Sequence, residues 1–405
     1  MTPESTSPRI VGQRLAAARK ARGITQEAAA EHLGLSRPTL IALEKGERAA
    51  KPNEIVKLAA FYGQPVHQFV RSTEPVTDFQ PHFRAALEKV KPAEADQLRA
   101  AIGEFKGFVE NYLDLERRMK DPMRLNYPQP INLNPRVNVA ELAEDVANRE
   151  RQRLGLGDQP IPNIRTLLES DVGVRIFFNR LPRMFAGMYV FVDGLGGCVL
   201  INSVHPAEKQ RASIAHEYAH LIVDRDRAGI DYLSVAGRKP ANERFAESFA
   251  LSFVMPAASV RMRFNEIVNS TGNFQVADLV RLKHFYFVSM EAMARRLEGL
   301  GLLPSGTWDL LRERELPVRE AETRLGLTTE LSPEPAYPER YKFLAVHAYE
   351  RGELSEKELA SYLRCDVWEA RRVIQEAMLS VEVDADGQAR PMHADFETSL
   401  LADHA

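Results

Sequence analysis

The chain has 405 residues and a mass of 45.6 kDa, which is more than one hydrophobic core usually supports, so two or three domains are expected. With 44% hydrophobic and 27% charged residues it has the composition of a globular protein, and no apolar stretch is long enough to cross a bilayer. The net charge of -3 excludes a protein that coats nucleic acid along its whole length.

Charge is distributed unevenly along the chain. Residues 1–72 contain 11 Lys and Arg against 6 Asp and Glu, so this segment carries about +5 and the remainder about -8. The first ten residues lack a basic region followed by an apolar core, and two cysteines cannot build a disulfide scaffold. A cytoplasmic protein with a basic N-terminal domain is expected.

Residues 1–72 are predicted to form a bundle of short helices. Apolar residues recur at helical spacing from Ile10 onward, and Gly23 ends the first helix. Thr25 can cap a second helix that ends at Gly34. Ser36 can cap a third helix, because the proline that follows lies in its first turn. These signals predict an all-α domain built around a helix-turn-helix.

Residues 73–135 are predicted to be a helical arm followed by a linker. Apolar residues recur at helical intervals from Phe83 to Met119. A proline-rich break from Pro122 to Pro135 then sets the domain boundary.

Residues 136–303 are predicted to form an α+β domain with a small sheet. A helix over 139–154 precedes three β-branched apolar runs at 172–178, 188–192 and 198–201, and the glycine-rich link between the last two indicates a hairpin. Helices resume at Ala207 and continue to about residue 303. Residues 304–405 carry further helical patterns and are predicted to be a regulatory or dimerisation region. The fold class is therefore multidomain and mainly α.

The stretch from Ile24 to Val66 carries the first family resemblance. Over Arg9 to Val70 the chain resembles the lambda-repressor-like, Cro-type (XRE) domains, in which a short helix reads DNA bases. The resemblance implies a phosphate contact by Gln26 and places Lys45 and Arg48 near the DNA backbone. Residues facing the major groove are implied to be Arg37, Thr39 and Ala42, with Ser36 at the cap of the same helix. It also implies a double-stranded operator bound by a homodimer.

The sequence His216-Glu217-Tyr218-Ala219-His220 predicts a metal site. Residues four apart share one helical face, so the two imidazoles can bind one ion while Glu217 lies beside it as a general base. Zinc suits nitrogen and oxygen ligands in a tetrahedron with one open position.

A third ligand is needed, and Glu243 is the stronger candidate. It lies 23 residues after His220, on a helix with an apolar stripe. Glu247, one turn later, is predicted to accept a hydrogen bond from a ligating histidine. Asp224, one turn after His220, is the alternative ligand.

Over residues 137–300 the chain resembles the ImmA/IrrE-type metallopeptidases. The resemblance rests on the motifs above together with Ala186-Gly187, Arg211 and the sequence E-x-x-A-x-x-F-A before Met255-Pro256. The resemblance implies a zinc-dependent endopeptidase that cleaves or inactivates a repressor-like protein, switching on a stress, mobile-element or defence response. A peptide substrate is expected to add along a strand edge at Cys198–Ile201. Tyr189, His205 and Tyr232 are equal candidates for stabilising an oxyanion.

Three functional interpretations follow. In the first, a DNA-binding regulator is fused to an endopeptidase that cleaves a repressor or itself. In the second, the zincin-like domain is a sensor or scaffold without proteolysis. In the third, the helix-turn-helix only tethers a protease to DNA-bound partners.

Overall fold

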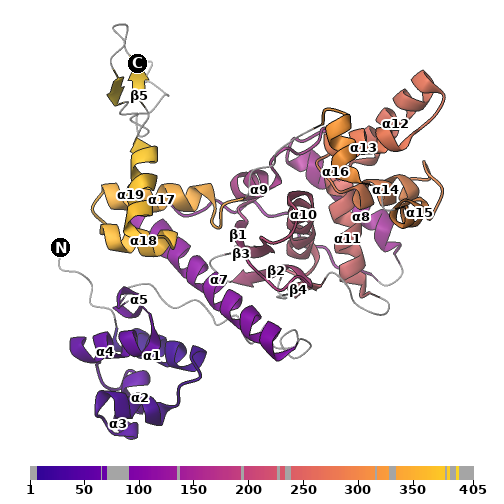
Figure 1. Ribbon diagram of the computed structural model, residues 1–405. Helices are drawn as coiled ribbons and strands as arrows, with labels where there is room; N and C mark the ends of the chain where they lie inside the picture. The colour runs from indigo at the N-terminus through magenta and orange to yellow at the C-terminus, as the bar shows by residue number, and fades with distance from the viewer. Residues whose placement is uncertain are drawn as a thin grey trace, which may run out of the picture. The chain divides into compact units, whose positions relative to one another are not determined.

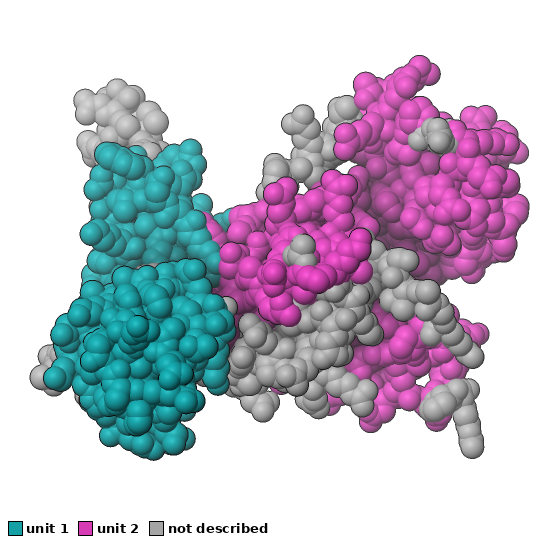
Figure 2. Space-filling view, turned by 60° about the horizontal axis from the view of Figure 1, so that its bottom comes forward, with its two compact units in different colours: residues 1–74, 111–122, 339–405 teal, residues 75–110, 123–338 magenta. Residues whose placement is uncertain are grey.

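A computed structural model describes residues 7–64, 66–70, 91–134, 137–192, 196–225, 229–232, 239–314, 317–327, 334–378, 381–383 and 389–391. The chain divides into two compact units, coloured separately in Figure 2. Unit 1 comprises residues 1–74, 111–122 and 339–405, and unit 2 comprises residues 75–110 and 123–338. The predicted fold class is confirmed: helical N-terminal and C-terminal regions flank a mainly α central domain with a small sheet (Figure 1).

The N-terminal part of unit 1 is a helical bundle with its own core. Its helices are α1 (Pro8–Ala21), α2 (Gln26–Leu33), α3 (Arg37–Glu44), α4 (Pro52–Tyr62) and α5 (His67–Val70). The Thr25 hydroxyl accepts the Ala28 N–H at 3.2 Å, so the predicted cap of α2 is present. Gly34 ends α2 with a φ of 66°, which glycine adopts without strain. This turn sets α2 against α3 as a helix-turn-helix.

The remainder of unit 1 gathers three helices at the end of a long one. These are α17 (Glu339–Glu350), α18 (Glu356–Leu363) and α19 (Val367–Met378), followed by the strands β5 (Val381–Val383) and β6 (Ala389–Pro391). Arg340 forms an ion pair at 2.9 Å with Glu116 near the end of α7 (Pro92–Met119). The buried Tyr362 hydroxyl donates to Asp114 on the same helix. Polar side chains thus bind α17 and α18 to the last turns of α7.

A four-stranded sheet organises unit 2. Its strands are β1 (Arg175–Asn179), β2 (Phe185–Val192), β3 (Gly196–Asn202) and β4 (Gly229–Tyr232), in the order β1-β3-β2-β4. The pairing of β2 with β3 is antiparallel, as the hairpin signal predicts, whereas β1 runs parallel to β3. The prediction of a peptide-binding edge at Cys198–Ile201 is wrong, because β3 is hydrogen-bonded to strands on both sides.

Helices cover both faces of this sheet (Figure 1). Ile176 and Phe178 of β1 point into a core shared with α8 (Val139–Arg153), α10 (Ala207–Val223) and α11 (Ala241–Val254). Phe177 between them points to the other face, where its ring lies 5.9 Å from Phe105 and 5.3 Å from Phe108 of α7. Alternation along one strand therefore explains why α10 and α7 lie on opposite sides.

The other helices of unit 2 are α9 (Ile164–Leu167), the π-helix η1 (Leu168–Val172), α12 (Ala257–Thr271), α13 (Val276–Phe285), α14 (Met290–Gly299), α15 (Thr307–Glu313) and α16 (Val318–Arg324). Buried Lys283 of α13 pairs with Glu208 of α10 and Glu322 of α16. The predicted C-terminal region 304–405 is thus divided: residues up to 338 join unit 2, and the rest join unit 1. Among the described helices, none is long and apolar enough to span a membrane.

Residues 122–134, the predicted linker, form an extended strap along unit 2. The Asn126 and Ile131 N–H groups donate to the Val172 and Ile222 carbonyls, each at 2.9 Å. The Tyr127 hydroxyl donates to the Gly173 carbonyl at 3.0 Å and accepts the Gly197 N–H at 2.9 Å. Most of the predicted break is therefore bound to the domain that follows it. Residues 73–90 of the predicted arm region, residues 71 and 72 of the predicted N-terminal domain, and Pro135 lie outside the described residues.

Candidate functional site

The two histidines of the motif lie one turn apart on α10 and face the same point. Their Nε2 atoms are 3.2 Å apart, and the side chains are almost completely buried. On the opposite side of α10, the Tyr218 hydroxyl donates to Glu150 of α8 at 2.7 Å. This hydrogen bond fixes the rotation of α10 and thereby the direction of both imidazoles.

Glu243 reaches the same point from the first turn of α11. Its Oε2 lies 3.4 Å from Nε2 of His216, and its Oε1 lies 3.7 Å from Nε2 of His220. The first turn of a helix favours a carboxylate electrostatically, because its free N–H groups point toward it. The apolar stripe predicted for this helix packs against α10 and α8 through stacked rings of Phe245, Phe249 and Phe253. The structure thus brings together the three side chains that the sequence selected.

The separations between these atoms fit a metal-binding site. A tetrahedral shell with bonds of about 2.0–2.1 Å puts neighbouring ligand atoms about 3.3 Å apart. The three observed distances, 3.2, 3.4 and 3.7 Å, lie close to that value. Two imidazole nitrogens and one carboxylate oxygen are also a donor set that divalent transition metals accept. The cluster of His216, His220 and Glu243 could therefore hold a metal ion.

The surroundings of Glu243 favour its ionised form. Burial acts to raise its pKa, but the hydrogen bond from His216 and the positive potential of both imidazoles outweigh burial. The net pKa of Glu243 lies below its usual value, so the side chain is a carboxylate at neutral pH.

A carboxylate does lie behind one histidine, but it is Asp224 instead of Glu247. Asp224 Oδ2 lies 3.2 Å from Nδ1 of His220 and accepts a 2.7 Å hydrogen bond from Asn242. Glu247 forms an ion pair with Lys239, and its side chain is 44% exposed. The prediction for Glu247 is thus corrected, since α11 directs its longer side chain outward. The spacing of four between His220 and Asp224 was the available sequence signal.

Glu217, the predicted general base, is enclosed between α10 and the sheet. It is 1% exposed, and its carboxylate lies against the backbone of Gly187 in β2. A Cβ at residue 187 would stand 2.6 Å from Oε1 of Glu217. Only glycine leaves this space, so Gly187 is a site residue. The sequence pattern includes Ala186-Gly187 but assigns no role to Gly187.

The three oxyanion candidates are not equivalent in the structure. The buried Tyr189 hydroxyl donates to the Arg225 carbonyl at 3.2 Å, and His205 Nε2 lies 3.0 Å from the Arg183 carbonyl. Both side chains thus engage backbone carbonyls. The side chain of Tyr232 lies outside the described residues.

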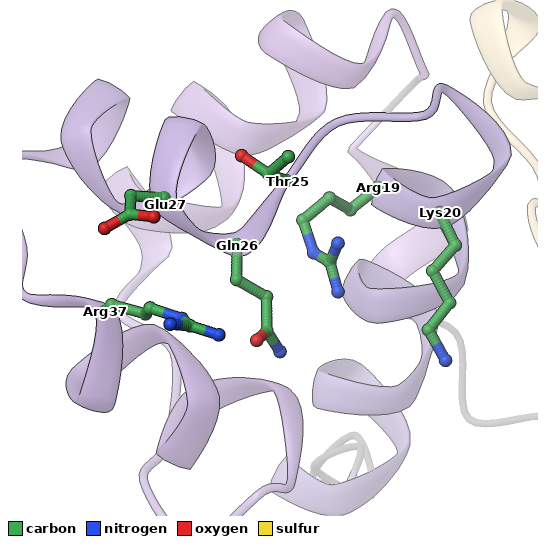
Figure 3. A pocket seen from close by; sticks show the side chains of 6 residues that line it. All are labelled: Arg19, Lys20, Thr25, Gln26, Glu27 and Arg37. Atoms are coloured by element: carbon green, nitrogen blue, oxygen red, sulfur yellow. The ribbon is translucent and has the colours of Figure 1, made fainter.

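The candidate DNA-binding face lies on α2 and α3. Ser36 caps α3, with its Oγ 2.8 Å from Oγ1 of Thr39. Arg37 and Lys45 are exposed, whereas Thr39 and Ala42 are half-buried. Figure 3 shows the Arg37 and Gln26 side chains directed toward one shallow hollow. Its lining residues are Arg19, Lys20, Thr25, Gln26, Glu27 and Arg37.

Gln26 is held in place by a buried ion pair. Arg19 Nε and Glu44 Oε1 lie 2.5 Å apart, and Gln26 Nε2 donates to the other oxygen of Glu44 at 2.9 Å. One amide N–H of Gln26 is thus used within the domain, and the second can donate to a phosphate. Arg48, expected near the DNA backbone, pairs with Glu54 at 2.7 Å, which balances its charge locally.

Comparison with known proteins assigns both regions. Residues 169–298 match the peptidase M78 model, described as an IrrE N-terminal-like domain, and residues 15–69 match a helix-turn-helix model. The chain is 37% identical over 57 residues to the cryptic phage CTXphi transcriptional repressor RstR of Vibrio cholerae. That match covers 14% of this chain and 51% of the repressor, so the chain spans about half the length of this relative. The chain therefore carries an XRE-type helix-turn-helix domain fused to a peptidase M78 domain of the IrrE/ImmA type.

Proposed function

We propose that this protein is a DNA-binding transcription regulator whose second domain is a zinc-dependent endopeptidase. The observation that carries the proposal is the convergence of His216, His220 and Glu243 at near-tetrahedral separations, with Glu217 on the same helix as the two histidines. The match of residues 169–298 to a peptidase domain supports the same conclusion.

In this proposal His216, His220 and Glu243 hold the ion. When bound, zinc supplies Lewis-acid catalysis and makes water acidic enough to act as a nucleophile near neutral pH. The anionic Glu243 balances part of the positive charge of the ion. The buried surroundings of the two histidines exclude bulk water and so strengthen each electrostatic interaction.

Glu217 moves the proton. Its position one residue after His216 puts a carboxylate beside the reacting water, where it accepts a proton and later delivers it to the leaving amine. Contact with the Gly187 backbone restricts the carboxylate to one position. A base held in this way stays oriented for proton transfer.

Among the described strands, β4 forms the sheet edge that suits an extended peptide. At the other edge, the Phe178 N–H of β1 donates to the Ala336 carbonyl at 2.8 Å, so the chain itself occupies that side. β4 is hydrogen-bonded on one side to β2, the strand that carries Gly187. We therefore propose that the substrate adds to β4 instead of β3.

The test compares the full-length wild type with Glu217→Gln. Both should contain one zinc ion per chain by mass spectrometry, and only the wild type should cleave a repressor-like protein from a neighbouring gene. Glu243→Ala should lose the ion as well as the cleavage. A wild type that binds zinc but cleaves no tested protein, including itself, would favour the sensor interpretation.

The DNA-binding half of the proposal rests on the face formed by α2 and α3. We propose that a homodimer binds a two-fold operator, with Arg37 of each chain at the base edges. The similarity to a phage repressor over 57 residues supports this use of the domain. Affinity measured by gel shift should fall steeply as salt rises, because basic side chains displace counterions from phosphates. Failure of the full chain to shift any promoter fragment at low salt would refute it.

A further inference from the structure

Asp224 lies where it can control the hydrogen position on His220. Its Oδ2 is 3.2 Å from Nδ1, the ring nitrogen that faces away from the cluster. A carboxylate can only accept, so Nδ1 must carry the hydrogen. The lone pair of His220 is then on Nε2, which is the atom that faces His216 and Glu243.

The position of Asp224 is itself fixed from several elements. Its N–H donates to the His220 carbonyl at 2.8 Å, and its side chain is 11% exposed. The next residue, Arg225, donates to the Pro128 carbonyl of the strap at 2.5 Å, and its own carbonyl accepts the hydroxyl of Tyr189 in β2. The end of α10 is therefore anchored to the sheet and to the strap.

Asn242 completes the arrangement from α11. Its Nδ2 donates to Asp224 Oδ2 at 2.7 Å, and it directly precedes Glu243 in the first turn of the helix. The first turn of α11 thus supplies Glu243, a candidate ligand, together with Asn242. Asn242 orients the Asp224 carboxylate, which lies behind His220.

We propose that Asp224, held by Asn242, is a positioning residue that fixes the tautomer and direction of His220 for metal binding. The inference rests on the proposed function, because it assumes that His220 is a ligand. Loss of an outer carboxylate of this kind typically weakens metal affinity about 10–100-fold.

The experiment measures zinc affinity of the full-length chain by competition with a chromophoric chelator. Asp224→Ala should weaken binding about 10–100-fold. Asp224→Asn should recover part of that loss, because an amide oxygen still accepts from Nδ1. Glu247→Ala is the matched control, since it removes a nearby carboxylate that is paired with Lys239, and it should leave affinity unchanged. Thermal unfolding of the metal-free variants should show that each is folded.

Asn242→Ala separates positioning from general stabilisation. If Asn242 acts through Asp224, its removal should weaken binding in the wild type but have no added effect in Asp224→Ala. The inference would be overturned if the losses of zinc affinity in Asn242→Ala and Asp224→Ala were additive. It would also be overturned if the wild type binds zinc and a folded Asp224→Ala chain binds it equally well. Either result would leave the proposed function standing. A wild type that binds no zinc would overturn both.

Discussion

Replacing Gly187 by alanine tests the placement of the general base directly. The added Cβ would lie 2.6 Å from Oε1 of Glu217, whereas ordinary contacts of this kind begin near 3.4 Å. The carboxylate must therefore move by about 0.8 Å. A displacement of about 1 Å in a catalytic group costs on the order of 100-fold in rate. The variant should keep its metal and lose most cleavage.

The same substitution should also lower stability in a way that depends on Glu217. Forcing an extra methyl into a packed site typically costs about 1–3 kcal/mol. In a Glu217→Ala background the carboxylate is absent and the closest remaining contact of the methyl is the Leu200 carbonyl oxygen at 3.2 Å, so we expect Gly187→Ala to cost less there than in the wild type. The resulting coupling energy should be about 1 kcal/mol or more.

Urea unfolding can measure this coupling without any substrate. Trp308 packs partly against the core of unit 2, whereas Trp368 is 76% exposed, so a Trp368→Phe background leaves one informative fluorophore. Gly197→Ala is a matched control in the next strand, because its Cβ would come closest to the flexible end of Leu221, at 3.2 Å, and would lie at ordinary contact distance, 3.6 Å, from the Tyr189 ring. An equal cost of Gly187→Ala in both backgrounds would refute the contact between Gly187 and the base.

Three further outcomes are expected. Arg37→Ala should cost about 1–3 kcal/mol of operator affinity in gel shifts and less on random DNA, because base contacts carry the specificity. Burial acts to raise the pKa of Glu144, but hydrogen bonds and the charge of Arg296 hold it below its usual 4.5. The carboxylate therefore stabilises the fold above that pH and loses its effect as pH falls through the lowered pKa. Glu144→Gln should lower stability by about 1–3 kcal/mol at pH 7, with the difference shrinking below pH 4 in urea titrations. Gly196→Ala should lower the melting temperature by several degrees, because Gly196 has a φ of 91° and a side chain there would collide with the Tyr127 hydroxyl.

The sequence was most informative where chemistry depends on local periodicity. A spacing of four on a helix requires His216 and His220 to share a face, and α10 begins at Ala207, where helices are predicted to resume. The prediction of Glu243 rests on a weaker argument. The helix that carries it has an apolar stripe, which must pack against another element of the domain. That stripe packs against α10 and α8, and this packing carries Glu243 to the histidines.

Features that depend on distant pairing were not predictable. The parallel pairing of β1 with β3 places β3 inside the sheet, and no local pattern reveals which strands become neighbours. β4 has four residues, too few for a recognisable alternation. The carboxylate behind His220 is Asp224 instead of Glu247 because Asn242 holds Asp224 and Lys239 pairs with Glu247. The positions of Asn242 and Lys239 are set by tertiary packing.

The structure also bears on whether the proposed endopeptidase would cut its own chain between the two domains. A peptide must be extended and must present N–H groups to add to a strand edge. Residues 92–119 are helical, with Leu98 and Phe105 fully buried, so cleavage there requires that helix to unwind. The strap is extended, but the N–H groups of Asn126 and Ile131 are already hydrogen-bonded, and its prolines have none. Each site would open only at the cost of the contacts that hold it. If the proposed peptidase activity is present, this arrangement therefore favours a separate repressor-like protein over residues 92–134 as its substrate.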